Sequence, residues 1–79
     1  MHYLSLTSFC ELTGLTVAEV SEFESRGLIA STTKDSNRFY SYTQAYRAKG
    51  IIFLMRTEKL TAEEAAAKMD EKAIAANRK

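Results

Sequence analysis

With 79 residues, of which 46% are hydrophobic and 27% charged, the chain is long enough for one globular domain and too apolar to be disordered. Its one cysteine and one histidine exclude an internal disulfide and a zinc site built from this chain alone, which would need three or four ligands. The net charge of +1 hides an uneven distribution, because residues 1–25 carry four glutamates and no lysine or arginine, whereas residues 26–59 carry seven basic residues against two acidic ones.

Two further features limit the class of protein. The N-terminus lacks the basic segment and apolar run of a signal peptide, and the longest apolar run, Ile51–Met55, is too short to span a bilayer. There is no glycine-rich phosphate loop and no Ser-His-Asp set, so we expect neither enzymatic activity nor a cofactor. We expect one cytoplasmic domain over residues 1–79, with its core at about 4–75, that is associated with the nucleoid if it binds DNA.

The first third predicts two helices joined by a tight turn. Thr7 is the expected cap of a helix over residues 8–13, which Gly14 ends. Thr16–Glu19 has the pattern of a capping box and predicts a second helix over residues 17–26, followed by Gly27 as its C-terminal cap. Val17, Val20 and Phe23 are expected to face the core, as is Cys10 in the first helix. Two helices joined in this way are typical of a helix-turn-helix.

A small hairpin, or wing, is predicted next. Residues 28–30 and 38–40 are the expected strands, and the polar segment 31–37 is the expected loop between them.

The last half predicts two further helices. Ser41–Gln44 is a second capping box and opens a helix to about residue 57, with core positions at Ala45, Ala48, Ile52 and Met55. Gly50 inside this helix indicates a close approach of another helix, because glycine there is otherwise unfavourable. Thr61–Glu64 is a third capping box and opens an alanine-rich helix. Its expected inward stripe is Ala62, Ala65, Ala66, Met69 and Ala73. The fold class predicted is mainly α: a winged helix-turn-helix with a small two-stranded wing and two further helices.

Four short motifs resemble the DNA-binding domain of the MerR family over about residues 6–69. They are Leu6-x-x-Phe9-Cys10-x-x-Thr13-Gly14-Leu15-Thr16, Val20-x-x-Phe23-Glu24-x-x-Gly27-Leu28-Ile29, Arg38-x-Tyr40-Ser41 and Leu60-Thr61-x-Glu63-Glu64. The order of predicted elements agrees. The chain departs from the family where an arginine and an aromatic residue usually precede the Phe-Glu pair, since Ser21 and Glu22 stand there.

This resemblance implies sequence-specific binding of double-stranded DNA, in transcription regulation or as an accessory factor in recombination, like the stand-alone BldC-like regulators and excisionases. The family's effector domain has no counterpart here, so no small-molecule sensing is expected. One domain offers few phosphate contacts, and we therefore expect self-association or a second protein on DNA.

A second resemblance offers an alternative function. The Phe9-Cys10 pair is similar to one in the chaperone modulators of the CbpM type, which share the fold and bind the J-domain of a DnaJ-type co-chaperone. The acidic first third favours this alternative, and the basic middle favours DNA. The sequence alone does not decide whether the acidic second helix faces DNA or a protein.

Nine residues are the predicted DNA contacts. Thr16, Val17 and Ser21 lie at the start and on the outer face of the second helix. Val17 is thus expected both to face the core and to contact DNA. The other six combine positive charge or a phenolic hydroxyl with a place on the wing or beside it. They are Arg26, Lys34, Arg38, Tyr40, Arg47 and Lys49. Glu24 matches a structural position of the family, Glu19 is used by the capping box, and Glu22 has no assigned role.

Overall fold

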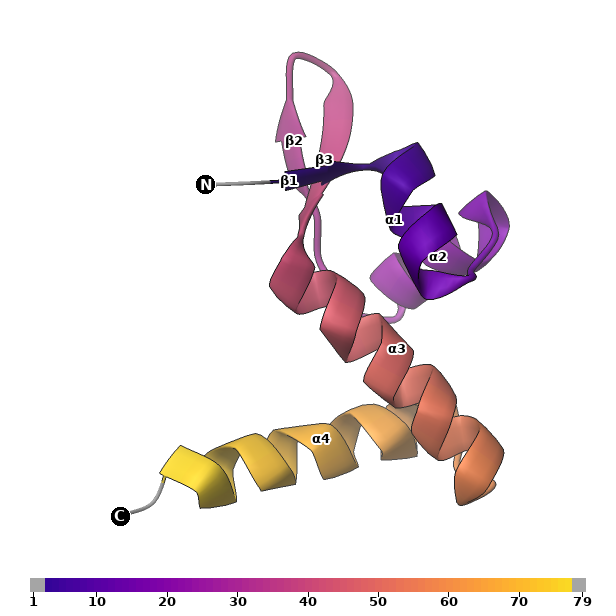
Figure 1. Ribbon diagram of the computed structural model, residues 1–79, viewed down its shortest axis with the longest axis vertical. Coiled ribbons are helices and arrows are strands. Elements are labelled where there is room, and N and C mark those ends of the chain that lie inside the picture. Colours follow the sequence, from indigo (N-terminus) through magenta and orange to yellow (C-terminus); the bar gives the residue numbers. More distant parts are fainter. Residues whose placement is uncertain (1–2, 78–79) are drawn as a thin grey trace.

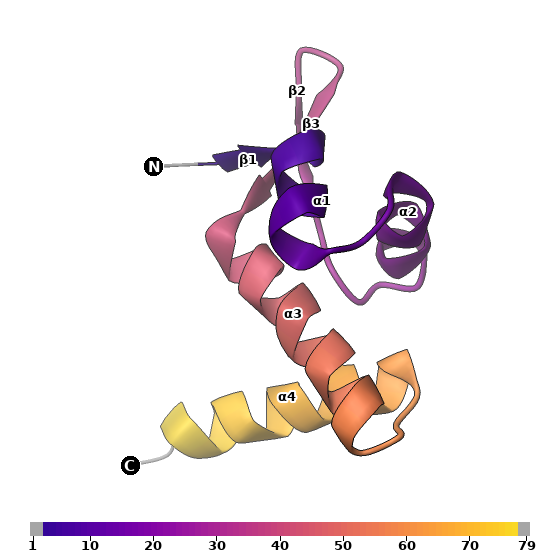
Figure 2. The same cartoon turned by 45° about the vertical axis from the view of Figure 1, so that its right-hand side comes forward.

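A computed structural model describes the backbone of residues 3–77 and the side chains of residues 3–71. The described residues form four helices and one three-stranded antiparallel sheet of strand order β1-β3-β2, which confirms the mainly α, winged fold class. In chain order the elements are β1 (Tyr3–Ser5), α1 (Leu6–Thr13), α2 (Val17–Ser25), β2 (Thr32–Lys34), β3 (Asn37–Ser41), α3 (Tyr42–Thr57) and α4 (Ala62–Asn77). Figures 1 and 2 show the wing and α4 at opposite ends of the molecule, with α3 running between them.

The start of the chain differs from the prediction. Residues 3–5 form β1, which pairs with β3 and makes the sheet three-stranded rather than two-stranded. The cap of α1 is Ser5, whose hydroxyl accepts from the N–H of Ser8 at 3.2 Å, and Thr7 lies inside the helix. The predicted Thr7 cap is therefore wrong, because β1 carries extended backbone directly to Ser5. Gly14 ends α1 with φ of 79°, as expected.

The capping box of α2 is confirmed. The Thr16 hydroxyl accepts from the N–H of Glu19 at 3.1 Å, and the Glu19 carboxylate accepts from the N–H of Thr16 at 2.9 Å. Val20 and Phe23 are buried, whereas Val17 is 55% exposed. The inward assignment of Val17 is thus wrong, because residues 16–19 at the start of α2 are all exposed and the buried face of the helix begins at Val20.

Gly27 follows α2 with φ of +73°, and the N–H of Leu28 donates to the carbonyl of Phe23 at 2.9 Å. These features form a Schellman-type end to the helix.

The wing begins later than predicted. Leu28 and Ile29 belong to the hydrophobic core and not to a strand, and β2 starts at Thr32 inside the segment expected to be a loop. β2 pairs with β3 across a two-residue turn, in which Asp35 and Ser36 have φ of 51° and 67°. Positive φ at both turn positions matches the type I′ hairpin turn, whose twist suits the flanking strands. Of the predicted strand 28–30, Leu28 and Ile29 are instead buried in the core, and Ala30 is exposed.

α3 begins as predicted, although its capping box is only half formed. The Ser41 hydroxyl accepts from the N–H of Gln44 at 3.3 Å. The Gln44 side chain does not return to Ser41, because its oxygen accepts from the N–H of Ala30 at 3.0 Å. The buried face of α3 is also rotated slightly from the prediction, so that Ile52 and Met55 are only partly buried. Its buried positions are Ala45, Ala48, Ile51 and Leu54.

α4 packs across the far end of α3. The predicted capping box at its start is confirmed, since Thr61 and Glu64 exchange bonds of 2.9 and 3.1 Å. The close helix approach predicted at Gly50 is also confirmed, because a Cβ there would lie 2.6 Å from Cε of Met69. The alanines of the predicted stripe whose side chains are described, Ala62, Ala65 and Ala66, are buried. The side chain of Ala73 lies outside the described residues.

The core lies where the sheet, α1, α2 and α3 meet. Its largest fully buried side chains are Tyr40, Phe9, Ile51 and Val20. The rings of Phe9 and Tyr40 stack with centroids 4.2 Å apart, which joins α1 to the wing strand β3. Cys10 lies at the edge of this core rather than inside it, and burial raises the pKa of its thiol. Among the described residues, no helix is long and apolar enough to cross a membrane.

Candidate nucleic-acid interface

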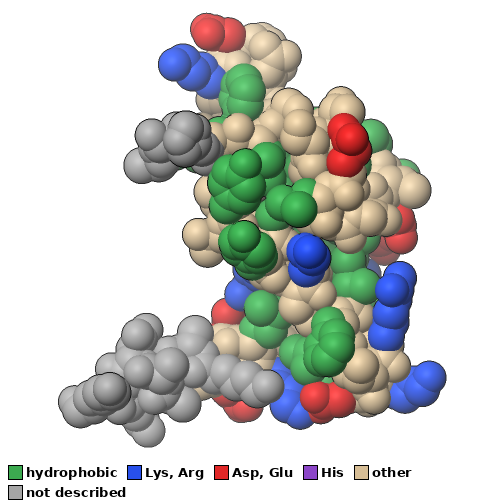
Figure 3. Space-filling model, viewed as in Figure 1, with side chains coloured by type: hydrophobic (Ala, Val, Ile, Leu, Met, Phe, Trp, Pro, Cys, Tyr) green, Lys and Arg blue, Asp and Glu red, His purple; other side chains and the backbone are tan. Residues whose placement is uncertain are grey.

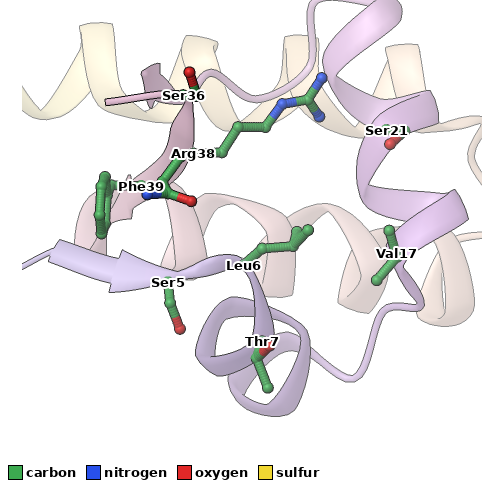
Figure 4. A pocket seen from close by; sticks show the side chains of 9 residues that line it. Ser5, Leu6, Thr7, Val17, Ser21, Ser36, Arg38 and Phe39 are labelled. Atoms are coloured by element: carbon green, nitrogen blue, oxygen red, sulfur yellow. The ribbon is translucent and has the colours of Figure 1, made fainter. Parts of the chain in front are cut away.

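A groove opens between the N-terminal end of α1, the outer face of α2 and the wing (Figure 4). It has a volume of about 480 Å³. Its lining residues are Ser5, Leu6, Thr7, Val17, Ser21, Ser36, Asn37, Arg38 and Phe39. The groove thus brings together three of the predicted DNA contacts, namely Val17 and Ser21 from α2 and Arg38 from β3. We call this surface the α2–wing groove.

Arg38 is the charged side chain of the groove. In Figure 4 it extends from the wing strand toward α2 and Ser21. Its Nη1 atom lies 3.7 Å from Oε2 of Glu24, and 48% of the side chain is exposed. A guanidinium carries five N–H donors. Most of the donors therefore remain open to an acidic group that enters the groove.

Glu24 on α2 joins the wing to this helix. Its carboxylate accepts from the hydroxyl of Tyr40 on β3 and, at 3.1 Å, from the hydroxyl of Ser31. It also forms the ion pair with Arg38. The carboxylate thus fixes the distance between α2 and the wing, which confirms the structural role predicted for Glu24.

Tyr40 does not belong to the exposed surface. Its side chain is 0% exposed, stacks on Phe9 and donates its hydroxyl to Glu24. Burial first, and then the hydrogen bond to the Glu24 carboxylate, raise the pKa of Tyr40 to about 12. The prediction that the Tyr40 hydroxyl contacts a phosphate is therefore corrected, because the fold uses this hydroxyl internally.

Arg26 is held by carboxylates within the fold. It donates to both carboxylate oxygens of Glu63 on α4 and forms an ion pair with Glu22 at 3.4 Å. The hydrogen bonds from Arg26 lower the pKa of the Glu63 carboxyl. This network gives Glu22, which the sequence left without a role, an intramolecular partner. It also directs Arg26 toward α4 rather than toward the α2–wing groove.

Arg47 is held in the same way. Its Nε donates to the carbonyl of Leu28 at 2.6 Å, and its Nη1 donates to Asp70 on α4 at 2.7 Å. The hydrogen bonds from Arg47 lower the pKa of Asp70. Arg47 is 25% exposed, so its guanidinium mainly connects α3 to α4 and to the segment after α2.

The remaining three predicted contacts, like Tyr40, Arg26 and Arg47, lie outside the groove lining. Thr16 is exposed at the start of α2, next to Val17 of the groove lining. Lys34 is exposed at the end of β2, where it lines a separate hollow with Tyr3, Thr32 and Phe39. Lys49 instead lines a separate hollow on α3 with Phe53 and Arg56. The structure therefore does not bring Lys49 to the surface that carries Arg38.

Sequence reasoning missed the contribution of the N-terminus. Ser5, Leu6 and Thr7 form one wall of the groove because β1 pairs with β3 and leads directly into α1. In the structure Tyr3–Ser5 alternates between exposed and buried positions, but three residues of sequence are too few for such an alternation to predict a strand.

The groove lining combines hydroxyl groups, one amide, one guanidinium and three apolar side chains. Among the described residues there is no group of three or more His, Cys, Asp or Glu side chains that could hold a metal ion. Hydroxyl and guanidinium donors beside an exposed helix face suit phosphate oxygens and base edges.

A family model described as MerR HTH family regulatory protein matches residues 4–72. No curated protein and no solved structure matches the chain.

Proposed function

Because the chain belongs to the MerR HTH family of regulatory proteins, we propose that it binds double-stranded DNA through the α2–wing groove and regulates transcription. In this arrangement α2 enters the major groove, and the wing follows the adjacent backbone. The observation that carries the proposal is the meeting of Val17, Ser21 and Arg38 in one groove whose two walls are joined by Glu24.

The exposed side chains divide into two kinds of contact. Arg38 and Lys34, on the wing, neutralise phosphates. Ser21 and Val17, on α2, face base edges, where a hydroxyl serves either as donor or acceptor and an apolar side chain packs against a thymine methyl. Thr16 lies at the border of this surface with its hydroxyl already used in the helix cap.

The acidic residues of α2 oppose DNA binding less than their number suggests. Glu19 is bonded to the backbone of Thr16, and Glu22 is paired with Arg26. Glu24 is 17% exposed and faces Arg38, Tyr40 and Ser31. Each carboxylate of this helix therefore has a partner within the fold, which lowers its repulsion of phosphates.

One copy of the chain is expected to bind DNA weakly. Arg26 and Arg47 are committed to carboxylates, so we expect about two to three phosphate contacts per copy. Function therefore needs a second copy or a second protein on the same DNA. An excisionase-like accessory factor in recombination would likewise need a second copy or a second protein on the DNA. This role is the alternative within the proposal.

A salt titration of binding to a random-sequence duplex tests the proposal. The logarithm of the binding constant should fall against the logarithm of salt concentration with a slope of about −2 to −3 per copy. Arg38→Ala should reduce the magnitude of the slope by about one, and Lys49→Ala, the matched control, should leave it unchanged. Absence of binding at low salt would contradict the proposal. Binding of a DnaJ-type J-domain in place of DNA would identify the protein as a chaperone modulator.

A further inference from the structure

Three aromatic side chains are exposed along the outer face of α3. Tyr42, Tyr46 and Phe53 are 45%, 64% and 62% exposed. Their spacing of four and eleven residues places them on one side of a helix with 3.6 residues per turn. In Figure 3 apolar side chains are exposed along the path of α3, with basic side chains among them. We call this the aromatic face of α3.

The charge of this face is positive. Lys49 and Arg56 lie on the same side of the helix and line the hollow beside Phe53, which has a volume of about 280 Å³. Neither cation forms an ion pair with any residue whose side chain the structure describes. The sequence of α3 contains no aspartate or glutamate, so no carboxylate on the helix balances them.

This combination is typical of a protein-binding surface. Tyrosine, phenylalanine and arginine are enriched at the centres of interfaces, where a few of them supply most of the binding energy. We propose that the aromatic face of α3 binds an acidic partner protein. The partner presents apolar side chains to Tyr46 and Phe53 and carboxylates to Lys49 and Arg56.

A second copy of this chain fits the face poorly. Seven of its carboxylates are already bonded within the fold. They are Glu19, Glu22, Glu24, Glu58, Glu63, Glu64 and Asp70. Among the described carboxylates, those of Glu11, Asp35 and Glu71 make no hydrogen bond or ion pair. These three lie on α1, the wing turn and α4, so they form no acidic surface complementary to Lys49 and Arg56.

Duplex DNA also fits the face poorly. Stacking aromatic side chains need unpaired bases, and a duplex presents only base edges and phosphates. The aromatic face contributes none of the residues that line the α2–wing groove. The two surfaces therefore serve different partners, and the binding of an acidic protein does not depend on the proposed DNA function.

Two synthetic helical peptides test the proposal by NMR titration of the ¹⁵N-labelled full chain. Both carry leucines at helical spacing; one is flanked by glutamates, and in the other every glutamate is replaced by lysine. The acidic peptide should shift the amides of Tyr46, Lys49 and Phe53 and bind at least about tenfold more tightly than the basic peptide. Phe53→Ser should weaken this binding about tenfold, as expected for an interface hot spot. Val17→Ser, which changes an exposed apolar residue on α2, should leave it unchanged.

Four results would overturn the proposal. The first is equal affinity for both peptides or no binding of either, and the second is a set of shifts that avoids α3. The third is self-association in sedimentation that Phe53→Ser removes, which would assign the face to a second copy. The fourth is a single-stranded oligonucleotide that shifts the same amides at lower concentration than the acidic peptide. Thermal melting of Phe53→Ser should match that of the parent chain, because the side chain is mostly exposed.

Discussion

The α2–wing groove and the aromatic face of α3 are both exposed surfaces with basic side chains, but the fold treats them differently. In the groove, Arg38 is paired with Glu24, and Glu24 also holds the buried hydroxyl of Tyr40. On α3, Lys49 and Arg56 have no such partners among the described side chains, and the rings project into solvent. The groove is therefore preorganised by interactions that also stabilise the domain. Changes there should affect folding and binding together, whereas changes on α3 should affect binding alone.

The largest contrast is expected between two tyrosines. Tyr40→Ala should lower the free energy of unfolding by about 3–5 kcal/mol, because it removes a fully buried ring that stacks on Phe9. Tyr46→Ala, on the exposed face of α3, should change it by less than about 0.5 kcal/mol. Denaturant unfolding of both variants measures the difference. Similar losses of unfolding free energy for the two variants would contradict the view that only the groove is tied to the stability of the domain.

Alkaline pH should destabilise the fold through ionisation of Tyr40. The pKa of Tyr40 is about 12 in the folded protein and about 10 in an unfolded chain, so the protonated hydroxyl favours folding. This contribution, about 2–3 kcal/mol, is complete below pH 10 and is lost as the pH rises through 12.

Unfolding measured across this pH range should show the decline, and Tyr40→Phe should abolish that part of it. An identical pH dependence in Tyr40→Phe would contradict the raised pKa of Tyr40 and thus the burial of its hydroxyl against Glu24.

Glu24→Gln should lower the free energy of unfolding by about 1–2 kcal/mol, because the amide cannot pair with Arg38 and binds the Tyr40 hydroxyl less strongly. Hydrogen exchange of the amides in β2 and β3 should become faster as the wing loses its connection to α2. Glu22→Gln is the matched control on the same helix, and its exposed ion pair should contribute less than about 0.5 kcal/mol. Equal losses of stability for the two substitutions would show that Glu24 contributes no more to the fold than Glu22 does.

The smallest predicted effect concerns the helix that carries the groove. Thr16→Ala should cost about 1 kcal/mol, because the capping bond to Glu19 is lost. Thr43→Ala, at an exposed position in the first turn of α3, should leave the midpoint of thermal unfolding unchanged or slightly higher, since alanine favours helix. An unchanged midpoint for Thr16→Ala would show that the first turn of α2 contributes little to the fold.

The sequence predicted those parts of the fold that depend on local chemistry. The capping boxes at Thr16 and Thr61 and the glycines after α1 and α2 gave the helix ends correctly, because each cap is made within a few residues. Gly50 correctly indicated the approach of α4. The wing was misplaced because Leu28 and Ile29 read equally well as a strand or as core, and only packing against the other elements decides between them.

The candidate site was harder to predict because it depends on long-range pairing. Nothing near Arg26 or Arg47 in the sequence shows that Glu63 and Asp70 reach them from α4. The burial of Tyr40 likewise follows from its stacking on Phe9, thirty-one residues earlier in the chain. By contrast, Ser21 could be placed on the outer face of α2 from the sequence, whereas the spacing of the apolar residues wrongly assigned Val17 to the core.

NMR mapping of the DNA-binding surface tests the central claim most directly. A duplex added to the ¹⁵N-labelled chain should shift the amides of Val17, Ser21 and Arg38, which line the α2–wing groove. The amides of Tyr46, Lys49 and Phe53 should not move at the same duplex concentration. The opposite pattern, with shifts confined to α3 and a silent groove, would contradict the account.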